Sequence, residues 1–224
     1  MYVIPPEQNA DFVAAMEDVL QTYRKPLDPR FPVVCMDEQP IQLIGETKMP
    51  LPAIPGRPDL YDYEYRRLGT TNIFMFTEPL SGWREARVST QKTKQDWARE
   101  VADLLDRCYP KAEQVTLVLD NLNTHSIGSL YATFTPEQAR RYADRLDLRY
   151  TPKHGSWLNI AECELSVFTK QCLDRRIEDE AILTRQANAW SAHRNQQQKG
   201  VDWQFTTETA RVKLKRLYPQ VQCG

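Results

Sequence analysis

Val33-Val34-Cys35-Met36-Asp37 and Val115-Thr116-Leu117-Val118-Leu119-Asp120 are two apolar, β-branched runs that each reach an aspartate. Their length and composition predict buried β-strands, and we expect each strand to end at its aspartate. A charge beside a buried strand is costly unless something compensates it, and a divalent metal is the usual compensation. The two stretches therefore predict a sheet with an acidic metal site at its edge.

The segments around these strands predict an α/β fold. Apolar residues at helical spacing indicate a helix within residues 6–25, and alternating residues predict strands between 60 and 90. The other expected elements are helices at 94–109, 137–146, 157–174, 179–197 and 207–217, and a short strand at 146–151. Strands first, then alternating helix and strand, then helices, is an order typical of a mixed central sheet.

The two aspartate-bearing strands are separated by hairpins and a crossover helix, so they can lie parallel and adjacent. Their carboxyl ends then coincide. Open α/β sheets place their functional sites at that edge. We therefore expect Asp37 and Asp120 to lie close together.

A third carboxylate follows the turn His154-Gly155-Ser156-Trp157-Leu158-Asn159-Ile160-Ala161-Glu162. If Ser156 is the N-cap, a helix begins at Trp157. The expected buried stripe of that helix is Trp157, Leu158, Ala161, Leu165, Phe168 and Cys172. Glu162 and Glu164 lie on opposite margins of the stripe, so helical geometry leaves both open as the third acidic ligand.

Composition sets broad limits. A chain of 224 residues suits one domain, or one domain with a helical appendage. No stretch reaches the length of a membrane span, and the N-terminus lacks the pattern of a secretory signal. Five cysteines without a Cys-x-x-Cys pair predict reduced thiols in a cytosolic protein. Only three histidines occur, none at helical ligand spacing, which argues against a zinc hydrolase.

Charge is unevenly distributed although the net charge is only −1. Residues 1–64 hold 11 Asp and Glu against 5 Lys and Arg, whereas residues 185–218 hold 2 against 7. This difference is either ordinary surface variation or a phosphate-contacting helical end beside an acidic metal pocket.

Several separated motifs carry a resemblance to a known family. They are Met36-Asp37-Glu38, Leu119-Asp120-Asn121 with His125 beyond it, Leu158-Asn159-x-x-Glu162, Asp62-Tyr-Glu-Tyr-x-Arg-x-Leu-Gly-Thr-x-Asn72, Tyr150-Thr-Pro-Lys-His-Gly-Ser-Trp157, and the tail Phe205-Thr-Thr-x-x-Ala-Arg-x-Lys-Leu-x-Arg-Leu-Tyr218. Together they resemble the DDE transposases of the mariner superfamily, and more closely its bacterial insertion-sequence branch, the IS-six-thirty family. The resemblance covers nearly the whole chain.

The resemblance implies an RNase H-like fold with a mixed five-stranded sheet flanked by helices and a C-terminal helical extension. It implies an N-terminal linker helix in 1–32, a DDE catalytic domain in 33–200, and a basic helix in 201–224 packed on that domain. By motif, Asp37, Asp120 and Glu162 are the catalytic and metal-binding triad, because the Leu-Asn-x-x-Glu pattern favours Glu162. Two Mg²⁺ or Mn²⁺ ions are the implied cofactors.

The same resemblance implies a function and partners. The function is metal-dependent DNA cleavage and strand transfer on transposon terminal inverted repeats and target DNA, by a homodimer in the bacterial cytoplasm at the nucleoid. Two carboxylate-held cations suit such chemistry, since they activate the attacking oxygen and stabilise the leaving one. The alternatives are another RNase H-like nuclease, or a truncated, non-catalytic copy that binds DNA ends or inhibits transposition.

Two departures from the family pattern are present. The gap between Asp120 and Glu162 holds 41 residues, longer than in the animal relatives, which points to an added segment near 126–145. Family members also carry an N-terminal helix-turn-helix region, and this chain has almost nothing before residue 33. We therefore expect that region to be missing here.

Six basic residues are candidate contacts to the DNA backbone. Lys153 and His154 precede the Glu162 helix, where a helix N-terminus favours phosphate, although a solvated turn is an equal alternative. The other four are Arg66, Arg211, Lys213 and Lys215. On a terminal helix such charges otherwise form a solvated face.

Four further residues are candidates for contacts behind the metal ligands. Asn121 and His125 could orient water or phosphate, or cap the loop after Asp120. We expect Glu38 to be a surface residue at a strand end, with a contact behind a metal ligand as the alternative. Glu164 stays open beside Glu162.

Overall fold

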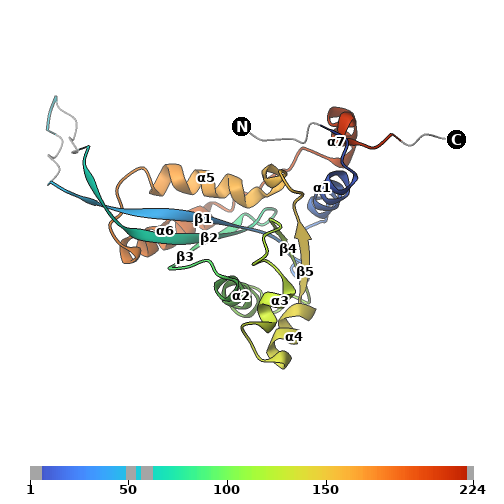
Figure 1. Cartoon of the computed structure of the whole chain (residues 1–224), viewed down its shortest axis with the longest axis horizontal. Coiled ribbons are helices and arrows are strands. Elements are labelled where there is room, and N and C mark those ends of the chain that lie inside the picture. Colours follow the sequence, from blue (N-terminus) through green and yellow to red (C-terminus); the bar gives the residue numbers. More distant parts are fainter. Residues whose placement is uncertain (1–6, 49–53, 57–62, 221–224) are drawn as a thin grey trace.

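The computed structural model describes residues 7–48, 54–56 and 63–220. Its centre is a five-stranded sheet of order β3-β2-β1-β4-β5 (Figure 1). The strands are β1 (Val33–Glu46), β2 (Tyr65–Glu78), β3 (Trp83–Ser89), β4 (Val115–Leu119) and β5 (Leu146–Tyr150). β1, β2 and β3 pair antiparallel, whereas β1, β4 and β5 pair parallel. The expected mixed five-stranded sheet is therefore confirmed.

Helices cover both faces of the sheet (Figure 1). They are α1 (Ala10–Tyr23), α2 (Lys94–Asp103), α3 (Ile127–Tyr131), α4 (Pro136–Asp144), α5 (Ile160–Cys172), α6 (Glu180–Gln197) and α7 (Thr207–Lys213). A π-helical turn extends α2 over Leu104–Cys108, and 3-10 turns occupy Ser156–Leu158 and Lys215–Leu217. One core cluster joins the sheet to α1, α5, α6 and α7, and a second joins its other face to α2, α3 and α4.

Alternating side chains of β1 divide between these two cores. Cys35 and Ile41 lie in the cluster on the α5 side, whereas Val34 and Met36 lie in the cluster on the α2 side. This period of two is the ordinary geometry of a strand. It places neighbouring residues at the start of β1 on opposite faces of the sheet.

One strand boundary expected from the sequence was wrong. β1 does not end at Asp37 but continues to Glu46. Its last residue pair with β4 is Cys35 with Val118, and beyond that point β1 pairs only with β2. Pairing with β4 ends just before Asp37, while β2 continues to satisfy the backbone of β1, and Ile41 and Leu43 return to the core further along the strand.

The helix that carries Glu162 begins later than expected. Residues 156–158 form a separate 3-10 turn, and Asn159, not Ser156, is the N-cap, with its Oδ1 accepting from the Ala161 amide. The expected stripe is otherwise buried at Leu158, Ala161, Leu165, Phe168 and Cys172. Trp157 is only partly buried, and its ring packs edge-on against Phe205 at 5.6 Å.

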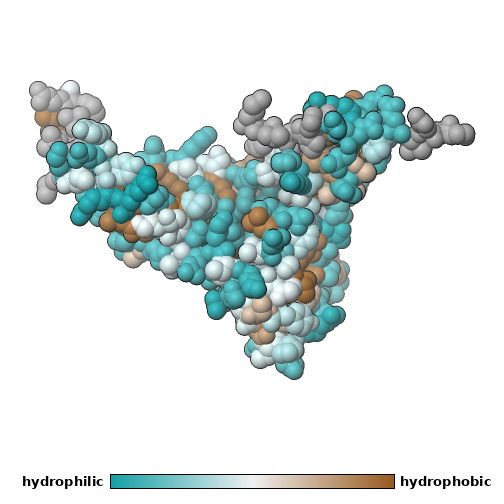
Figure 2. Space-filling view, in the orientation of Figure 1, coloured by the Kyte–Doolittle hydropathy of each residue, from teal (hydrophilic) through white to brown (hydrophobic). Residues whose placement is uncertain are grey.

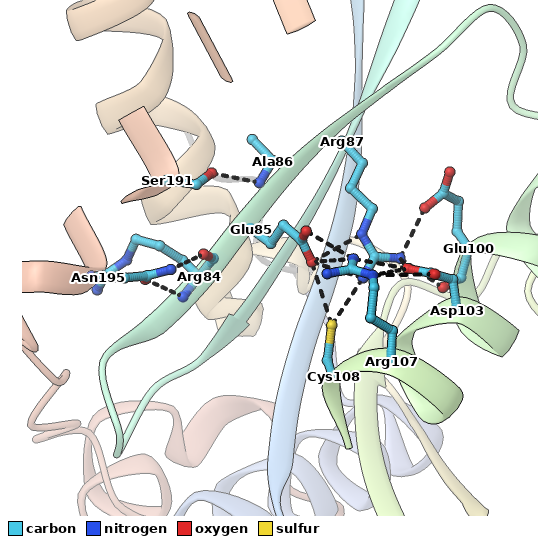
Figure 3. Close-up of polar contacts among 10 residues, drawn as sticks. All are labelled: Arg84, Glu85, Ala86, Arg87, Glu100, Asp103, Arg107, Cys108, Ser191 and Asn195. Carbon is cyan, nitrogen blue, oxygen red and sulfur yellow. Dashed lines mark hydrogen bonds and ion pairs between the residues drawn. The ribbon is translucent and has the colours of Figure 1, made fainter. Parts of the chain in front are cut away.

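β3 also uses both of its faces, through polar contacts (Figure 3). On one face, the Arg84 backbone exchanges two hydrogen bonds with the Asn195 side chain of α6, at 2.9 and 2.8 Å. Ser191 Oγ accepts from the Ala86 amide at 3.0 Å. These contacts attach α6 to the edge of the sheet.

On the other face of β3, an ion network joins the strand to α2 and the π-helical turn (Figure 3). Glu85 pairs with Arg87 and Arg107, each at 2.8 Å. Arg87 also pairs with Glu100 at 3.0 Å and with Asp103 at 2.9 Å. We call these five residues the β3–α2 ion network.

The N- and C-terminal helices pack together on the sheet. Phe12 and Met16 of α1 lie in the same core cluster as Leu217, and the Asn9 amide donates to the Leu217 carbonyl at 3.0 Å. The segment expected to be an insertion, 126–145, contains α3 and α4. The described cysteines, 35, 108, 163 and 172, are free thiols, and Cys223 lies outside the described residues.

The visible surface is mostly hydrophilic, and apolar residues occupy small, separate areas (Figure 2). Within the described part of the chain, no helix is both long enough and apolar enough to cross a membrane.

Candidate active site

Asp37 lies on the α5 side of the sheet, where β1 has passed the end of β4. Its neighbour Gln39, on the same face, accepts a hydrogen bond from Thr169 of α5 at 3.1 Å. The Asp37 Oδ1 accepts from the Glu38 amide at 2.7 Å. The carboxylate is therefore fixed at the sheet surface and only partly shielded from solvent.

Asp120 follows β4 directly. The parallel register pairs Cys35 with Val118, and two further residues along each strand bring Asp37 level with Asp120. A hydrogen bond from the Thr151 amide to the Leu119 carbonyl, at 2.9 Å, holds the end of β4 to the chain leaving β5. The expectation that the two aspartates lie at one sheet edge is thus met by the register.

Glu162 is brought to the same edge by Asn159. The Asn159 Nδ2 donates to the Met36 carbonyl at 2.8 Å, while its Oδ1 caps α5. Glu162 lies in the first turn of α5. One buried amide thus connects the start of this helix to the residue before Asp37.

Glu164 has a different environment, although it is only two residues further on. It is buried, and its carboxylate pairs with Arg84 at 2.9 Å and with Arg194 at 3.2 Å. By contrast, Glu162 and Asp37 line one open groove of about 650 Å³, together with Gln39, Ser166, Thr169 and Lys170. The two glutamates left open by helical spacing therefore lie in separate surroundings.

The acidic residues at this edge repel one another. Burial raises the pKa of Asp37, and the charges of Asp120, Glu162 and Glu38 raise it further, whereas the hydrogen bond from the Glu38 amide opposes them. The resulting pKa is about 7. Within the described residues, no Lys or Arg forms an ion pair with Asp37 or Glu162. We call Asp37, Asp120 and Glu162 the acidic cluster.

The acidic cluster suits a hard divalent cation by its donor chemistry. It offers carboxylate oxygens, which Mg²⁺ and Mn²⁺ prefer. The Asp120 side chain is 31% exposed, so part of its carboxylate is open to a ligand although its Oδ1 lies 2.7 Å from a histidine nitrogen. The side chains are not already gathered around one point, since no described group of three or more His, Cys, Asp or Glu is arranged to hold an ion.

Two sequence expectations concerned Glu38 and His125. Glu38 is not a surface residue at a strand end, because β1 continues and its side chain is only 3% exposed. Its Oε1 lies 2.9 Å from the Nε2 of His125, and the Nδ1 of His125 lies 2.7 Å from Asp120 Oδ1. The expectation of a surface position was wrong because Glu38 faces the α2 side, where the loop after β4 covers it.

The candidate DNA-contacting residues lie in three places. Lys153 and His154 are exposed and line a second groove of about 450 Å³ with Asp120 and Asn121. His154 has a positive φ of 66°, which turns the chain sharply before α5. The groove therefore joins basic side chains to one member of the acidic cluster.

The other basic candidates are distant from that groove. Arg66 is exposed on the outer part of the β1–β2 hairpin. Lys213 at the end of α7 and Lys215 in the 3-10 turn after it are exposed on the opposite side of the molecule (Figure 1). Arg211 forms two hydrogen bonds of 2.8 Å with Glu17 of α1, so its charge is already compensated. In the motif that runs from Asp62 to Asn72, Asp62 lies outside the described residues.

Comparison with known proteins decides the family. Residues 32–184 match the family model described as DDE superfamily endonuclease, which is more than half of the chain. The chain belongs to the DDE superfamily endonucleases. No curated protein sequence matches this chain.

Solved structures show the fold of this DDE endonuclease. It resembles the Mos1 mariner paired-end complex with Mg, with a TM-score of 0.59 and 16% identity over 98% of this chain and 66% of that one. It also resembles the Mos1 paired-end complex with Mn, with a TM-score of 0.54 and 16% identity over 85% and 58% of the two chains. The expected RNase H-like fold is therefore confirmed. The chain spans about three fifths to two thirds of the length of these structures.

Proposed function

We propose that this DDE endonuclease is the catalytic domain of a transposase, which cleaves DNA and transfers the cut strand with Asp37, Asp120 and Glu162 as its metal-binding residues. The observation that carries the proposal is the acidic cluster. Three motifs far apart in the sequence bring carboxylates to one sheet edge, and those of Asp37 and Glu162 have no basic partner there. This arrangement is costly unless cations bind.

Two Mg²⁺ or Mn²⁺ ions held by these three carboxylates would activate the attacking oxygen and neutralise charge on the phosphate. The chain itself supplies the positioning. Asn159 orients α5 against β1, and the groove beside Glu162 gives a DNA strand access to the cluster. Lys153 and His154, beside Asp120, are placed to contact the phosphates on either side.

The finer parts of the proposal rest on motif resemblance and on the related structures. We assign the chain to the bacterial IS-six-thirty branch, acting as a homodimer on terminal repeats and target DNA in the cytoplasm. Two related Mos1 structures are paired-end complexes, one with Mn and one with the left transposon end, which supports a DNA-paired assembly. The proposed division remains 1–32, 33–200 and 201–224, with Arg66, Lys213, Lys215 and Arg211 as outer DNA contacts.

A plasmid assay tests the catalytic assignment. The chain is incubated with supercoiled plasmid that carries the DNA flanking its own reading frame, with Mg²⁺, Mn²⁺ or EDTA. We expect metal-dependent cleavage and joined products. Asp37→Asn, which keeps the size of the side chain, should lower cleavage by about 10⁴-fold or more, because groups that act as a unit lose most of their activity together.

Each result of this assay decides between functions. Cleavage that Asp37→Asn retains overturns the site assignment. Cuts without joined products favour a hydrolytic nuclease, since hydrolysis makes only cuts. Binding of the flanking DNA without any cleavage favours a non-catalytic DNA-end binder. Circular dichroism of Asp37→Asn confirms that any loss of activity occurs in a folded protein.

A further inference from the structure

The imidazole of His125 is enclosed between two carboxylates. Its side chain is fully buried, and its Nε2 lies 2.9 Å from Glu38 Oε1. Its Nδ1 lies 2.7 Å from Asp120 Oδ1 and 3.2 Å from the Asp120 carbonyl. Both ring nitrogens therefore contact acceptors, one on each of two separate motifs.

Glu38 reaches this histidine because β1 alternates its side chains. Asp37 faces α5, so the next residue faces the α2 side, where Val34 and Met36 also lie. There the Glu38 carboxylate is buried to 3% exposure, and its Oε2 lies 3.7 Å from Lys92 Nζ. Asp37 and Glu38, the adjacent acids of the Met-Asp-Glu motif, thus point to opposite faces of the sheet.

The position of His125 is fixed by three further contacts. Its ring stacks on Trp97 of α2, with centroids 5.7 Å apart and planes at 28°. Its carbonyl accepts from the Tyr150 hydroxyl at 2.7 Å, and its amide donates to the Leu122 carbonyl at 2.9 Å. The ring is therefore a rigid support and not a mobile loop residue.

Asp120, in contrast, begins a loop and has little other support. Its side chain is 31% exposed. A carboxylate at the end of a strand samples several rotamers unless a neighbour restricts it. Among the described residues, only His125 places a polar side chain against this carboxylate, with its Nδ1 2.7 Å from Oδ1.

We propose that Glu38 and His125 are positioning residues that hold the Asp120 carboxylate in place to bind metal. Glu38 orients the ring through Nε2, and the ring restricts Asp120 through Nδ1, which leaves Oδ2 of Asp120 for a ligand. The inference rests on the proposed function, since Asp120 must be a metal ligand for its orientation to matter. Partners behind a metal ligand commonly change affinity by about 10–100-fold.

The test measures Mn²⁺ binding to the full chain by the electron paramagnetic resonance signal of the free ion. Glu38→Gln keeps the size of the side chain and removes its charge. We expect its Mn²⁺ affinity to fall by about tenfold, and the affinity of His125→Gln to fall further. Saturating Mn²⁺ should restore most of the cleavage rate of Glu38→Gln, because the ligands themselves are unchanged.

A matched control separates positioning from general packing. Glu100→Gln removes another shielded, ion-paired carboxylate on the same side of the sheet, but one that contacts Arg87 and not His125. We expect it to alter the unfolding midpoint without changing Mn²⁺ affinity. A second readout is the nuclear magnetic resonance signal of the His125 ring nitrogens, which should shift in Glu38→Gln and not in Glu100→Gln.

The outcomes distinguish this inference from the proposed function. If the wild-type chain binds no Mn²⁺, the metal-site assignment itself fails. If the wild type binds Mn²⁺ and a folded Glu38→Gln binds it equally well, only the positioning role fails. Should Glu38→Gln not fold, the affinity of folded His125→Gln decides by the same criterion, and an equal reduction in Glu100→Gln would also overturn the role.

Discussion

The β3–α2 ion network and the acidic cluster are both rich in carboxylates, yet they are built in opposite ways. In the network, Arg87 and Arg107 contact Glu85 from two elements (Figure 3). In the acidic cluster, Asp37 has acidic neighbours and no paired Arg or Lys within the described residues. The network has its counter-charges within the protein, whereas Asp37 and Glu162 of the acidic cluster have none among the described residues.

The pKa values express this difference. Burial opposes ionisation of Glu85, but the charges and hydrogen bonds of Arg87 and Arg107 outweigh it and lower its pKa. Burial also opposes ionisation of Asp37, and there the neighbouring acids add to it, so its pKa rises to about 7. Burial opposes ionisation of both carboxyls, and the charges of their neighbours decide whether the pKa rises or falls.

The largest expected contrast is between Glu162 and Glu164, which repeat this difference within one helix. Glu162→Gln should lower metal-dependent cleavage by about 10³-fold or more while leaving the unfolding free energy nearly unchanged. Glu164→Gln should lower the unfolding free energy by about 3–5 kcal/mol, because Arg84 is left buried without its counter-charge. Urea unfolding and plasmid cleavage on both variants measure the two effects.

The opposite pattern of effects for the two variants would contradict the distinction between the ion-paired Glu164 and the unpaired Glu162. A folded Glu164→Gln that has lost cleavage, beside an active Glu162→Gln, would place the third ligand at Glu164. Arg84→Lys serves as a second control, since it should weaken the buried pair without touching the acidic cluster.

The pH dependence of stability should also distinguish the two regions. The folded-state pKa of Asp37 lies above its ordinary value near 4, so between about pH 4 and 7 the folded chain holds a proton that the unfolded chain has released. Stability from this group is therefore present at low pH and lost as the pH rises. Without metal, we expect the contribution of Asp37 to the unfolding free energy to fall by roughly 2 kcal/mol as the pH rises from 5 to 7.

Urea unfolding in EDTA at several pH values measures this effect as the difference between wild type and Asp37→Asn. Glu85→Gln should show the opposite sign, because the lowered pKa of Glu85 gives stability that is present above its unfolded value and lost in acid. A wild-type profile that runs parallel to Asp37→Asn from pH 5 to 7 would contradict the raised pKa.

The sequence predicts the strands of the sheet but not the residues at which they end. Apolar runs predicted the core strands, since Val34, Met36 and Leu117 are buried as the pattern requires. The pattern could not show that β1 continues past Asp37, because the polar residues that follow stay in the strand by pairing with β2, before Ile41 and Leu43 return to the core. Strand ends depend on partners that a single run of sequence does not contain.

The same limit applies to the candidate site. Helical spacing left Glu162 and Glu164 open because their difference lies in Arg84, which is 80 residues away in the chain. The role of Asn159 was missed although an Asn before an apolar helix is an N-cap signal, since Ser156 offered an equally good cap. The contact between Glu38 and His125 joins two motifs, so neither motif alone could indicate it.

A smaller effect is expected for Asn159, which connects α5 to the acidic cluster. Asn159→Ala removes the helix cap and leaves the Met36 carbonyl without its donor, so we expect a loss of about 1–3 kcal/mol in unfolding free energy. Cleavage should fall as Glu162 loses its fixed position. Ser156→Ala is the matched control, because Ser156 lies within the 3-10 turn and Asn159 caps α5. Equal losses in the two variants would show that Asn159 has no special role.

The smallest effects should come from the basic residues, and they extend the comparison to cations. Lys153 is exposed beside Asp120 and forms no ion pair within the described part of the chain, whereas Arg211 is paired with Glu17. Lys153→Ala should weaken DNA binding a few-fold and reduce the salt dependence of log K by about one unit. Arg211→Ala should change DNA binding less, and its effect on the unfolding free energy should be small, because the Arg211 side chain is exposed. Fluorescence anisotropy with labelled duplex at several salt concentrations measures DNA binding by both variants. A larger effect of Arg211→Ala than of Lys153→Ala would indicate that DNA lies along α7 and not along the Asp120 groove.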